Sequence, residues 1–126
     1  MGEPRQKVIL EVDDNDAGRY AVARVLRAAG FDVREAATGE DALRMALERP
    51  DLVLLDVNLP GTNGFEILAK MKQVPALKAT PVIMTTAEAT RPAVMKGLVG
   101  GADGYLTKPL KSENLLKGVR TVLGLA

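Results

Sequence analysis

The sequence predicts an α/β domain in which five parallel strands form one sheet and five helices cover both of its faces. Apolar runs at Val8 to Val12, Leu52 to Leu55 and Pro81 to Met84 alternate with longer stretches of helical period. Their apolar residues are nearly continuous, which indicates strands covered on both faces, as in sheets whose parallel strands are joined by crossover helices. Weaker strand signals at Phe31 to Arg34 and Gly104 to Leu106 complete a fivefold alternation of strand and helix.

The first helix is expected from about Asp16 to Ala28. Gly30 follows it at the C′ position, where glycine readily adopts a left-handed conformation. The face of this helix that packs on the sheet is expected to consist of apolar residues at helical spacing. These are Tyr20, Ala21, Val25 and Ala28 or Ala29.

A Ser, Thr or Asn precedes each of the other four helices, where its side chain can accept a hydrogen bond from a free amide of the first turn. These expected N-caps are Thr38, Asn63, Thr90 and Ser112. The fourth helix also contains Gly97, which costs about 1 kcal/mol relative to alanine in a helix interior. Two interpretations of Gly97 stay open: close packing, or a helix that shifts easily between two states.

Length and composition exclude several classes of protein. A chain of 126 residues corresponds to a single domain, which we expect to span residues 1–126. It contains no cysteine and no histidine, so disulfides, thiolate metal sites and histidine general bases are excluded. Seventeen basic and 16 acidic residues without a basic block predict no direct nucleic-acid binding. Neither a signal peptide nor a membrane-spanning segment is predicted, and a cytoplasmic location is expected.

Polar residues follow four of the predicted strands at their carboxyl ends. They are Asp13 and Asp14 after the first strand, Asp56 after the third, Thr85 and Thr86 at the fourth, and Thr107 and Lys108 at the fifth. The carboxyl ends of parallel strands lie along one edge of the sheet, where ligands of such sheets bind. We therefore expect three carboxylates, a hydroxyl and an ammonium to meet at this edge.

Three neighbouring carboxylates require a proton or a cation. Two of them about 4 Å apart repel by roughly 4 kcal/mol at an effective dielectric near 20. Mg²⁺ suits such a site because it binds one or two carboxylates together with water and phosphate oxygens. A carboxylate beside Mg²⁺ and lysine can attack phosphorus and form an aspartyl phosphate. Asp56 is the preferred nucleophile, because Asp13 and Asp14 are paired like metal ligands.

Four motifs carry a family resemblance. "VDDN" (12–15), "LLDVNLPGTNG" (54–64), "MTTAEA" (84–89) and "GYLTKP" (104–109) resemble, in order and spacing, the receiver domain of two-component response regulators. The resemblance implies a flavodoxin-like five-stranded parallel sheet of order 2-1-3-4-5, and a single receiver domain without an output domain. Two origins stay open: a stand-alone receiver of the chemotaxis or phosphorelay type, and a receiver from a hybrid sensor histidine kinase.

The resemblance implies a role for each polar residue at the sheet edge. Asp56 is similar to the phosphoacceptor of the family. Asp13 and Asp14 resemble its acidic pair, which with Asp56 and the backbone carbonyl of Asn58 would bind Mg²⁺ or Mn²⁺. Such a domain catalyses its own phosphorylation and dephosphorylation but is not a conventional turnover enzyme.

Further positions resemble the family's phosphate-binding and switch residues. Lys108 and Thr86 would contact the phosphoryl group, and Thr86 and Tyr105 would form the switch. Asn58 and Glu88, two positions beyond Asp56 and Thr86, would modulate dephosphorylation.

The resemblance also implies partners. A histidine kinase or a histidine phosphotransfer protein would supply the phosphoryl group. A downstream protein target would bind the surface of helix 4, strand 5 and helix 5, and the domain would be a monomer or a weak dimer without membrane insertion. Arg19, Arg24 and Arg27 of the first helix are interpreted as a solvated face, with contact to a partner kinase as the alternative.

Some residues depart from the family pattern. Asn63 stands where the family often has aspartate, and Glu11 interrupts a strand that is usually apolar. Two alternative functions stay open. A haloacid-dehalogenase-like phosphatase would need a second aspartate where Asn58 stands, and a non-phosphorylated, receiver-like interaction module would not need the intact acidic and lysine positions.

Overall fold

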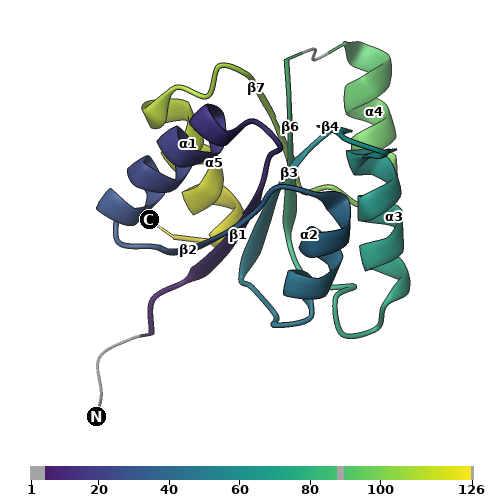
Figure 1. Cartoon of the computed structure of the whole chain (residues 1–126), viewed down its shortest axis with the longest axis horizontal. Coiled ribbons are helices and arrows are strands. Elements are labelled where there is room, and N and C mark those ends of the chain that lie inside the picture. Colours follow the sequence, from purple (N-terminus) through teal and green to yellow (C-terminus); the bar gives the residue numbers. More distant parts are fainter. Residues whose placement is uncertain (1–4, 88–89, 126) are drawn as a thin grey trace.

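The computed structural model describes residues 5–87 and 90–125, which form one sheet between two layers of helices (Figure 1). The strands of this sheet are β1 (Val8–Val12), β2 (Asp32–Ala36), β3 (Leu52–Asp56), β6 (Val82–Thr86) and β7 (Gly104–Thr107). Neighbouring strands are all parallel, in the order β2-β1-β3-β6-β7. The expected order 2-1-3-4-5 is confirmed, with β6 and β7 as its fourth and fifth strands.

The helices divide between the two faces of the sheet (Figure 1). One face carries α1 (Asp16–Ala28) and α5 (Ser112–Leu123), and the other carries α2 (Gly39–Ala46), α3 (Gly64–Gln73) and α4 (Arg91–Val99). Successive residues of a strand point to opposite faces. Ile9 and Leu54 therefore pack in the core beneath α1 and α5, and Leu10 and Leu55 pack in the other core. Burial on both sides holds the carboxyl ends of the strands in place.

A short antiparallel pair, β4 (Asn58–Leu59) and β5 (Thr62–Asn63), lies between β3 and α3. The sequence did not predict it, because strands of two residues carry no period. The pair folds the chain back behind Asp56, where the Gly64 amide donates to the Val57 carbonyl at 2.7 Å. A Cβ at Gly64 would collide with the carbonyl oxygen of Asp56. Glycine is thus required where α3 begins against the end of β3.

The apolar face predicted for α1 is correct at Val25 and Ala29, which pack partly buried against the core, but wrong at Tyr20 and Ala21. The buried residues are Val22, Ala23 and Leu26, whereas Tyr20 is 64% exposed and Ala21 is exposed. Alanines occur on several sides of this helix, so periodicity alone allows more than one apolar stripe. The bounds of the helix are confirmed, and Gly30 ends it with a φ of 97°.

Three of the four predicted N-caps are confirmed. The side chains of Thr38, Asn63 and Thr90 accept hydrogen bonds from the amides of Asp41, Glu66 and Ala93. The fourth prediction, Ser112, is wrong. Lys111 occupies the N-cap of α5 without a side-chain hydrogen bond, and Ser112 is the first residue of the helix. Within the described residues, no helix combines the length and the apolar character needed to cross a membrane.

Candidate functional site

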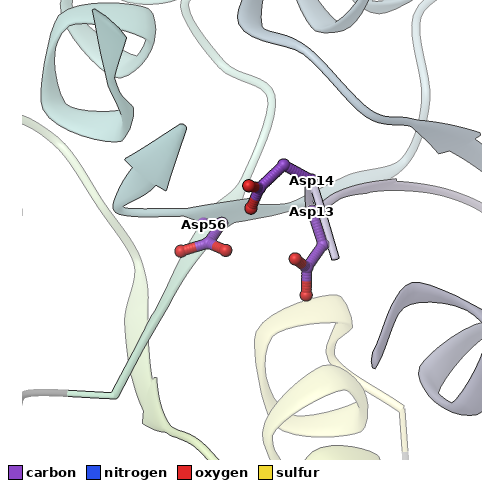
Figure 2. A group of neighbouring side chains, drawn as sticks. All are labelled: Asp13, Asp14 and Asp56. Atoms are coloured by element: carbon purple, nitrogen blue, oxygen red, sulfur yellow. The ribbon is translucent and has the colours of Figure 1, made fainter. Parts of the chain in front are cut away.

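Three carboxylates meet at the carboxyl edge of the sheet, as the strand ends predicted. Asp13 and Asp14 follow β1, and Asp56 is the last residue of β3 (Figure 2). Each offers a carboxylate oxygen within 4.8 Å of the others. Asp13 and Asp56 are only 6% and 3% exposed, whereas Asp14 is exposed. The cluster is therefore anchored on its inner side and open to solvent at Asp14.

Two donors orient the carboxylate of Asp56. Its Oδ1 accepts a hydrogen bond from the Asn58 amide at 2.9 Å, and its Oδ2 accepts one from Lys108 Nζ at 2.7 Å. Burial raises the pKa of Asp56 above its ordinary value, and Asp13 raises it further, while Lys108 and the Asn58 amide oppose the shift without cancelling it. A cation beside Asp56 would stabilise its ionised form.

Asp13 is held by the turn that leads into α1. Its Oδ1 accepts from the Asn15 amide at 2.9 Å, and its Oδ2 accepts from Lys108 Nζ at 3.1 Å. Asn15 in turn caps α1 by accepting from the Gly18 amide at 2.7 Å. The start of the helix and the position of the carboxylate are thus fixed by one short segment.

Lys108 connects the two buried carboxylates. It lies just after β7, its amide donates to the Thr86 carbonyl at 2.6 Å, and its peptide bond to Pro109 is cis. Burial lowers the pKa of Lys108, but the hydrogen bonds of its ammonium to Asp56 and Asp13 raise it more, so the pKa lies above its ordinary value. Lys108 therefore remains a cation in the site.

The predicted switch residues lie on β6, which pairs with β3, and on β7, which pairs with β6. Thr86 ends β6 and is buried, one residue beyond the partner of Asp56 in the strand register. Tyr105 lies on β7, and its hydroxyl is buried without a hydrogen-bond partner among the described residues. A Cβ at Gly97 would lie 3.1 Å from the Tyr105 ring, so Gly97 serves close packing of α4 against β7.

The remaining predicted positions are Asn58, Glu88 and Asn63. Asn58 contributes its amide to Asp56, and the residue is exposed at the edge of the site. Glu88 lies outside the described residues. Asn63 keeps the expected capping role, and its side chain bonds the Glu66 amide at 3.0 Å.

The structure gives two residues, Glu11 and Arg19, surroundings that the sequence did not predict. Glu11 is 3% exposed and faces Glu35 across β1 and β2. Burial, with Glu35 and Asp13, raises its pKa to about 8, so Glu11 is protonated at neutral pH. Arg19, interpreted as part of a solvated face, instead turns inward and binds the backbone of Asp13. No local pattern signals either arrangement, because both depend on residues brought close by the fold.

The donor set fits Mg²⁺ or a similar hard divalent cation. The three clustered side chains all offer carboxylate oxygens, and the exposure of Asp14 leaves room for the waters that Mg²⁺ retains. A cation here would share Asp13 and Asp56 with the ammonium of Lys108. The site can therefore combine a carboxylate nucleophile with two kinds of positive charge.

Comparisons with known proteins agree with this geometry. The response regulator receiver domain family matches residues 9–120. The transcriptional regulatory protein AfsQ1 of Streptomyces coelicolor is 40% identical over 116 residues, covering 91% of this chain and 50% of that protein. The DNA-binding response regulator MtrA of Mycolicibacterium smegmatis is 39% identical over 124 residues, covering 98% of this chain and 53% of that protein. The chain thus spans about half the length of these curated relatives.

The solved structure of chemotaxis protein CheY4 of Vibrio cholerae matches with a TM-score of 0.90 at 36% identity, covering 94% of this chain and 99% of that chain.

Proposed function

Because this chain belongs to the receiver domain family of response regulators, we propose that it is a phosphorylation-dependent signalling switch whose phosphoacceptor is Asp56. The phosphoryl donor would be the phosphohistidine of a histidine kinase or of a histidine phosphotransfer protein. One observation carries the proposal: Asp56 is buried at a strand end, 2.7 Å from the ammonium of Lys108, in a cluster with Asp13 and Asp14. This is the arrangement that transfer of a phosphoryl group to a carboxylate requires.

In the proposed reaction a carboxylate oxygen of Asp56 attacks phosphorus. The new O–P bond forms as the P–N bond of the phosphohistidine breaks, and the electron pair of that bond stays on the leaving imidazole. Lys108 neutralises charge on the phosphoryl oxygens, since its ammonium already contacts the acceptor carboxylate. Mg²⁺, held by Asp13, Asp14, Asp56 and the backbone carbonyl of Asn58, would supply further neutralisation when bound. The Asn58 amide orients the acceptor through Oδ1.

The two alternatives are less well supported. A haloacid-dehalogenase-like phosphatase would need a carboxylic acid two residues beyond Asp56, and Asn58 cannot serve as one. A non-phosphorylated interaction module would not need a buried Asp56 paired with Lys108.

We also propose that the chain acts in the cytoplasm through protein partners rather than by direct contact with nucleic acid, as a monomer or a weak dimer. Its 17 basic and 16 acidic residues give an excess of only one positive charge, which is small for binding DNA.

Incubation with acetyl phosphate and Mg²⁺ should add one phosphoryl group to the protein. The small donor supplies the phosphoryl group without a kinase, because the receiver provides the catalytic groups. Intact-mass measurement should show a single adduct, which disappears when Mg²⁺ is removed by a chelator. An adduct that forms equally well in chelator, or no adduct at any Mg²⁺ concentration, would contradict the proposal.

Thr86→Ala should separate phosphorylation from the switch. We propose that the Thr86 hydroxyl bonds the phosphoryl group and that the surface of α4, β7 and α5 then changes. A charge-assisted hydrogen bond contributes about 1.5 to 3 kcal/mol, a roughly 10- to 150-fold shift between two states. The variant should still be phosphorylated. With beryllofluoride and Mg²⁺, however, it should show much smaller amide shift changes at Tyr105, at residues 96–98 and at residues 111–115.

Thr107→Ala is the matched control. Thr107 pairs with Thr86 in the register of β6 and β7 but is exposed. Its loss should leave the amide response intact. Equal responses in Thr86→Ala and in the wild type, or a wild-type response confined to α1 and α2, would show that another route carries the signal.

A further inference from the structure

Arg19 lies next to the acidic cluster, and each of its three guanidinium nitrogens contacts an oxygen atom of a neighbouring residue. It is the fourth residue of α1, and its side chain is 17% exposed. Nη1 donates to the backbone carbonyl of Asp13 at 2.8 Å, and Nη2 donates to Asp16 Oδ1 at 2.8 Å. Nε lies 3.3 Å from Glu35 Oε1. One side chain thus ties the loop after β1 to α1 and β2.

The bond to Asp13 concerns the metal-binding carboxylates directly. The carbonyl group of Asp13 is part of the peptide plane that joins Asp13 to Asp14, and this plane is rigid. A donor that fixes this carbonyl therefore fixes the positions of the two Cα atoms from which the side chains leave the backbone. The Asp13 carboxylate has its own partners in Asn15 and Lys108, whereas the exposed Asp14 side chain has no hydrogen bond or ion pair among the described residues.

The charge of Arg19 is largely balanced by its own partners. Asp16 and Glu35 both contact the guanidinium, so its net field at the cluster is small. What Arg19 contributes is the geometry of a planar fork whose nitrogens reach a carbonyl and two carboxylates at once, which a lysine ammonium cannot reproduce. A positional role and a purely electrostatic role therefore predict different results for Arg19→Lys.

We infer that Arg19 is a positioning residue for the divalent-cation site, holding the Asp13–Asp14 peptide in the orientation that binds the ion. This role rests on the proposed function, because it concerns the same Mg²⁺ site. Groups that orient metal ligands without touching the metal typically change metal affinity by about 10- to 100-fold when removed. Arg19 would act in this way through a backbone carbonyl.

Arg27 provides a matched control on the same helix. Its Nη2 lies 3.2 Å from the other oxygen of Glu35 and donates to the Val33 carbonyl at 2.8 Å. It thus joins α1 to β2 as Arg19 does, but within residues 5–87 and 90–125 its side chain makes no hydrogen bond or ion pair with the loop that carries Asp13 and Asp14. Arg27→Gln removes the same charge and the same kind of tie to Glu35 while leaving the loop restrained.

The test is a Mg²⁺ titration of the unphosphorylated protein, followed by amide chemical shifts, with thermal unfolding in chelator measured in parallel. Arg19→Gln and Arg19→Lys should each bind Mg²⁺ about 10-fold more weakly than wild type, and Arg27→Gln should bind it normally. In chelator, the two glutamine variants should lose similar amounts of thermal stability. The phosphorylation rate of Arg19→Gln should recover at saturating Mg²⁺, because the deficit lies in metal affinity.

Each other outcome counts against the inference. Normal Mg²⁺ affinity in Arg19→Gln, or an equal loss in Arg27→Gln, would show that Arg19 does not position the site. Normal affinity in Arg19→Lys would make its role electrostatic. If the wild type bound no Mg²⁺, the proposed function itself would fail, and this role with it. A wild type that binds Mg²⁺ while Arg19→Gln binds it equally well would overturn only the role of Arg19.

Discussion

Replacing Lys108 by methionine is expected to slow phosphorylation of Asp56 by about 100-fold, the effect of removing one donor that stabilises developing charge. The same change should tighten Mg²⁺ binding, because Lys108 Nζ lies 2.7 Å from Asp56 and 3.1 Å from Asp13 and therefore competes with the metal for their charge. A unit charge about 4 Å away interacts by roughly 4 kcal/mol at an effective dielectric near 20, which makes a tenfold gain in affinity a modest expectation. In this variant the phosphorylation rate should thus fall while the affinity for Mg²⁺ rises.

The measurements are the phosphorylation rate at saturating Mg²⁺ and the Mg²⁺ affinity of the unphosphorylated protein. Lys111→Met is the control, because Lys111 is exposed and, in the described part of the chain, its side chain forms no ion pair with the three carboxylates. That variant should match wild type in both. If Lys108→Met lost affinity and rate together, the lysine would serve to hold the site together rather than to neutralise the phosphoryl group.

Glu11→Gln is expected to remove a pH-dependent cost of folding. Burial first, and then Glu35 and Asp13, raise the pKa of Glu11 from 4.5 to about 8 in the folded protein. Between these values the folded protein binds a proton that the unfolded chain does not, so the free energy of unfolding falls as pH rises. Each pKa unit corresponds to about 1.4 kcal/mol, so from pH 4 to pH 7 the variant should gain about 3 kcal/mol relative to wild type. Below pH 4 the difference should be constant.

Urea unfolding in chelator across this pH range checks the prediction. Asp56, whose pKa is also raised, contributes to the pH dependence of both proteins and cancels in the difference. Glu48→Gln, at an exposed surface position, should show no such trend. A Glu11→Gln difference that stays constant from pH 4 to pH 8 would mean that Glu11 is ionised in the folded protein.

The sequence predicts the fold and much of the site because both follow from short-range patterns. Nearly continuous apolar runs specify buried parallel strands, and parallel strands bring their carboxyl ends to one edge. The approach of Asp13, Asp56 and Lys108 then follows from the positions of these residues at strand ends. Their hydrogen bonds, 2.7 and 3.1 Å from the lysine to the two carboxylates, match that expectation.

Other features depend on contacts that no local pattern contains. The buried side of α1 is predicted only in part, at Val25 and Ala29, because small apolar residues lie on several sides of the helix and only packing selects Val22 and Leu26. Arg19 is likewise predicted to lie on a solvated face, but its side chain contacts Asp13 and Glu35. Glu11 remained unexplained for the same reason, since the raised pKa arises from burial beside a neighbouring strand.

The central claim is that Asp56, among three clustered carboxylates, carries the phosphoryl group. Borohydride reduces an aspartyl phosphate to homoserine, so the acceptor can be identified by peptide mass spectrometry after phosphorylation with acetyl phosphate and Mg²⁺. Homoserine should appear at position 56 in wild type, at no other position, and nowhere in Asp56→Asn. Homoserine at position 13 or 14, or its persistence in Asp56→Asn, would contradict the account.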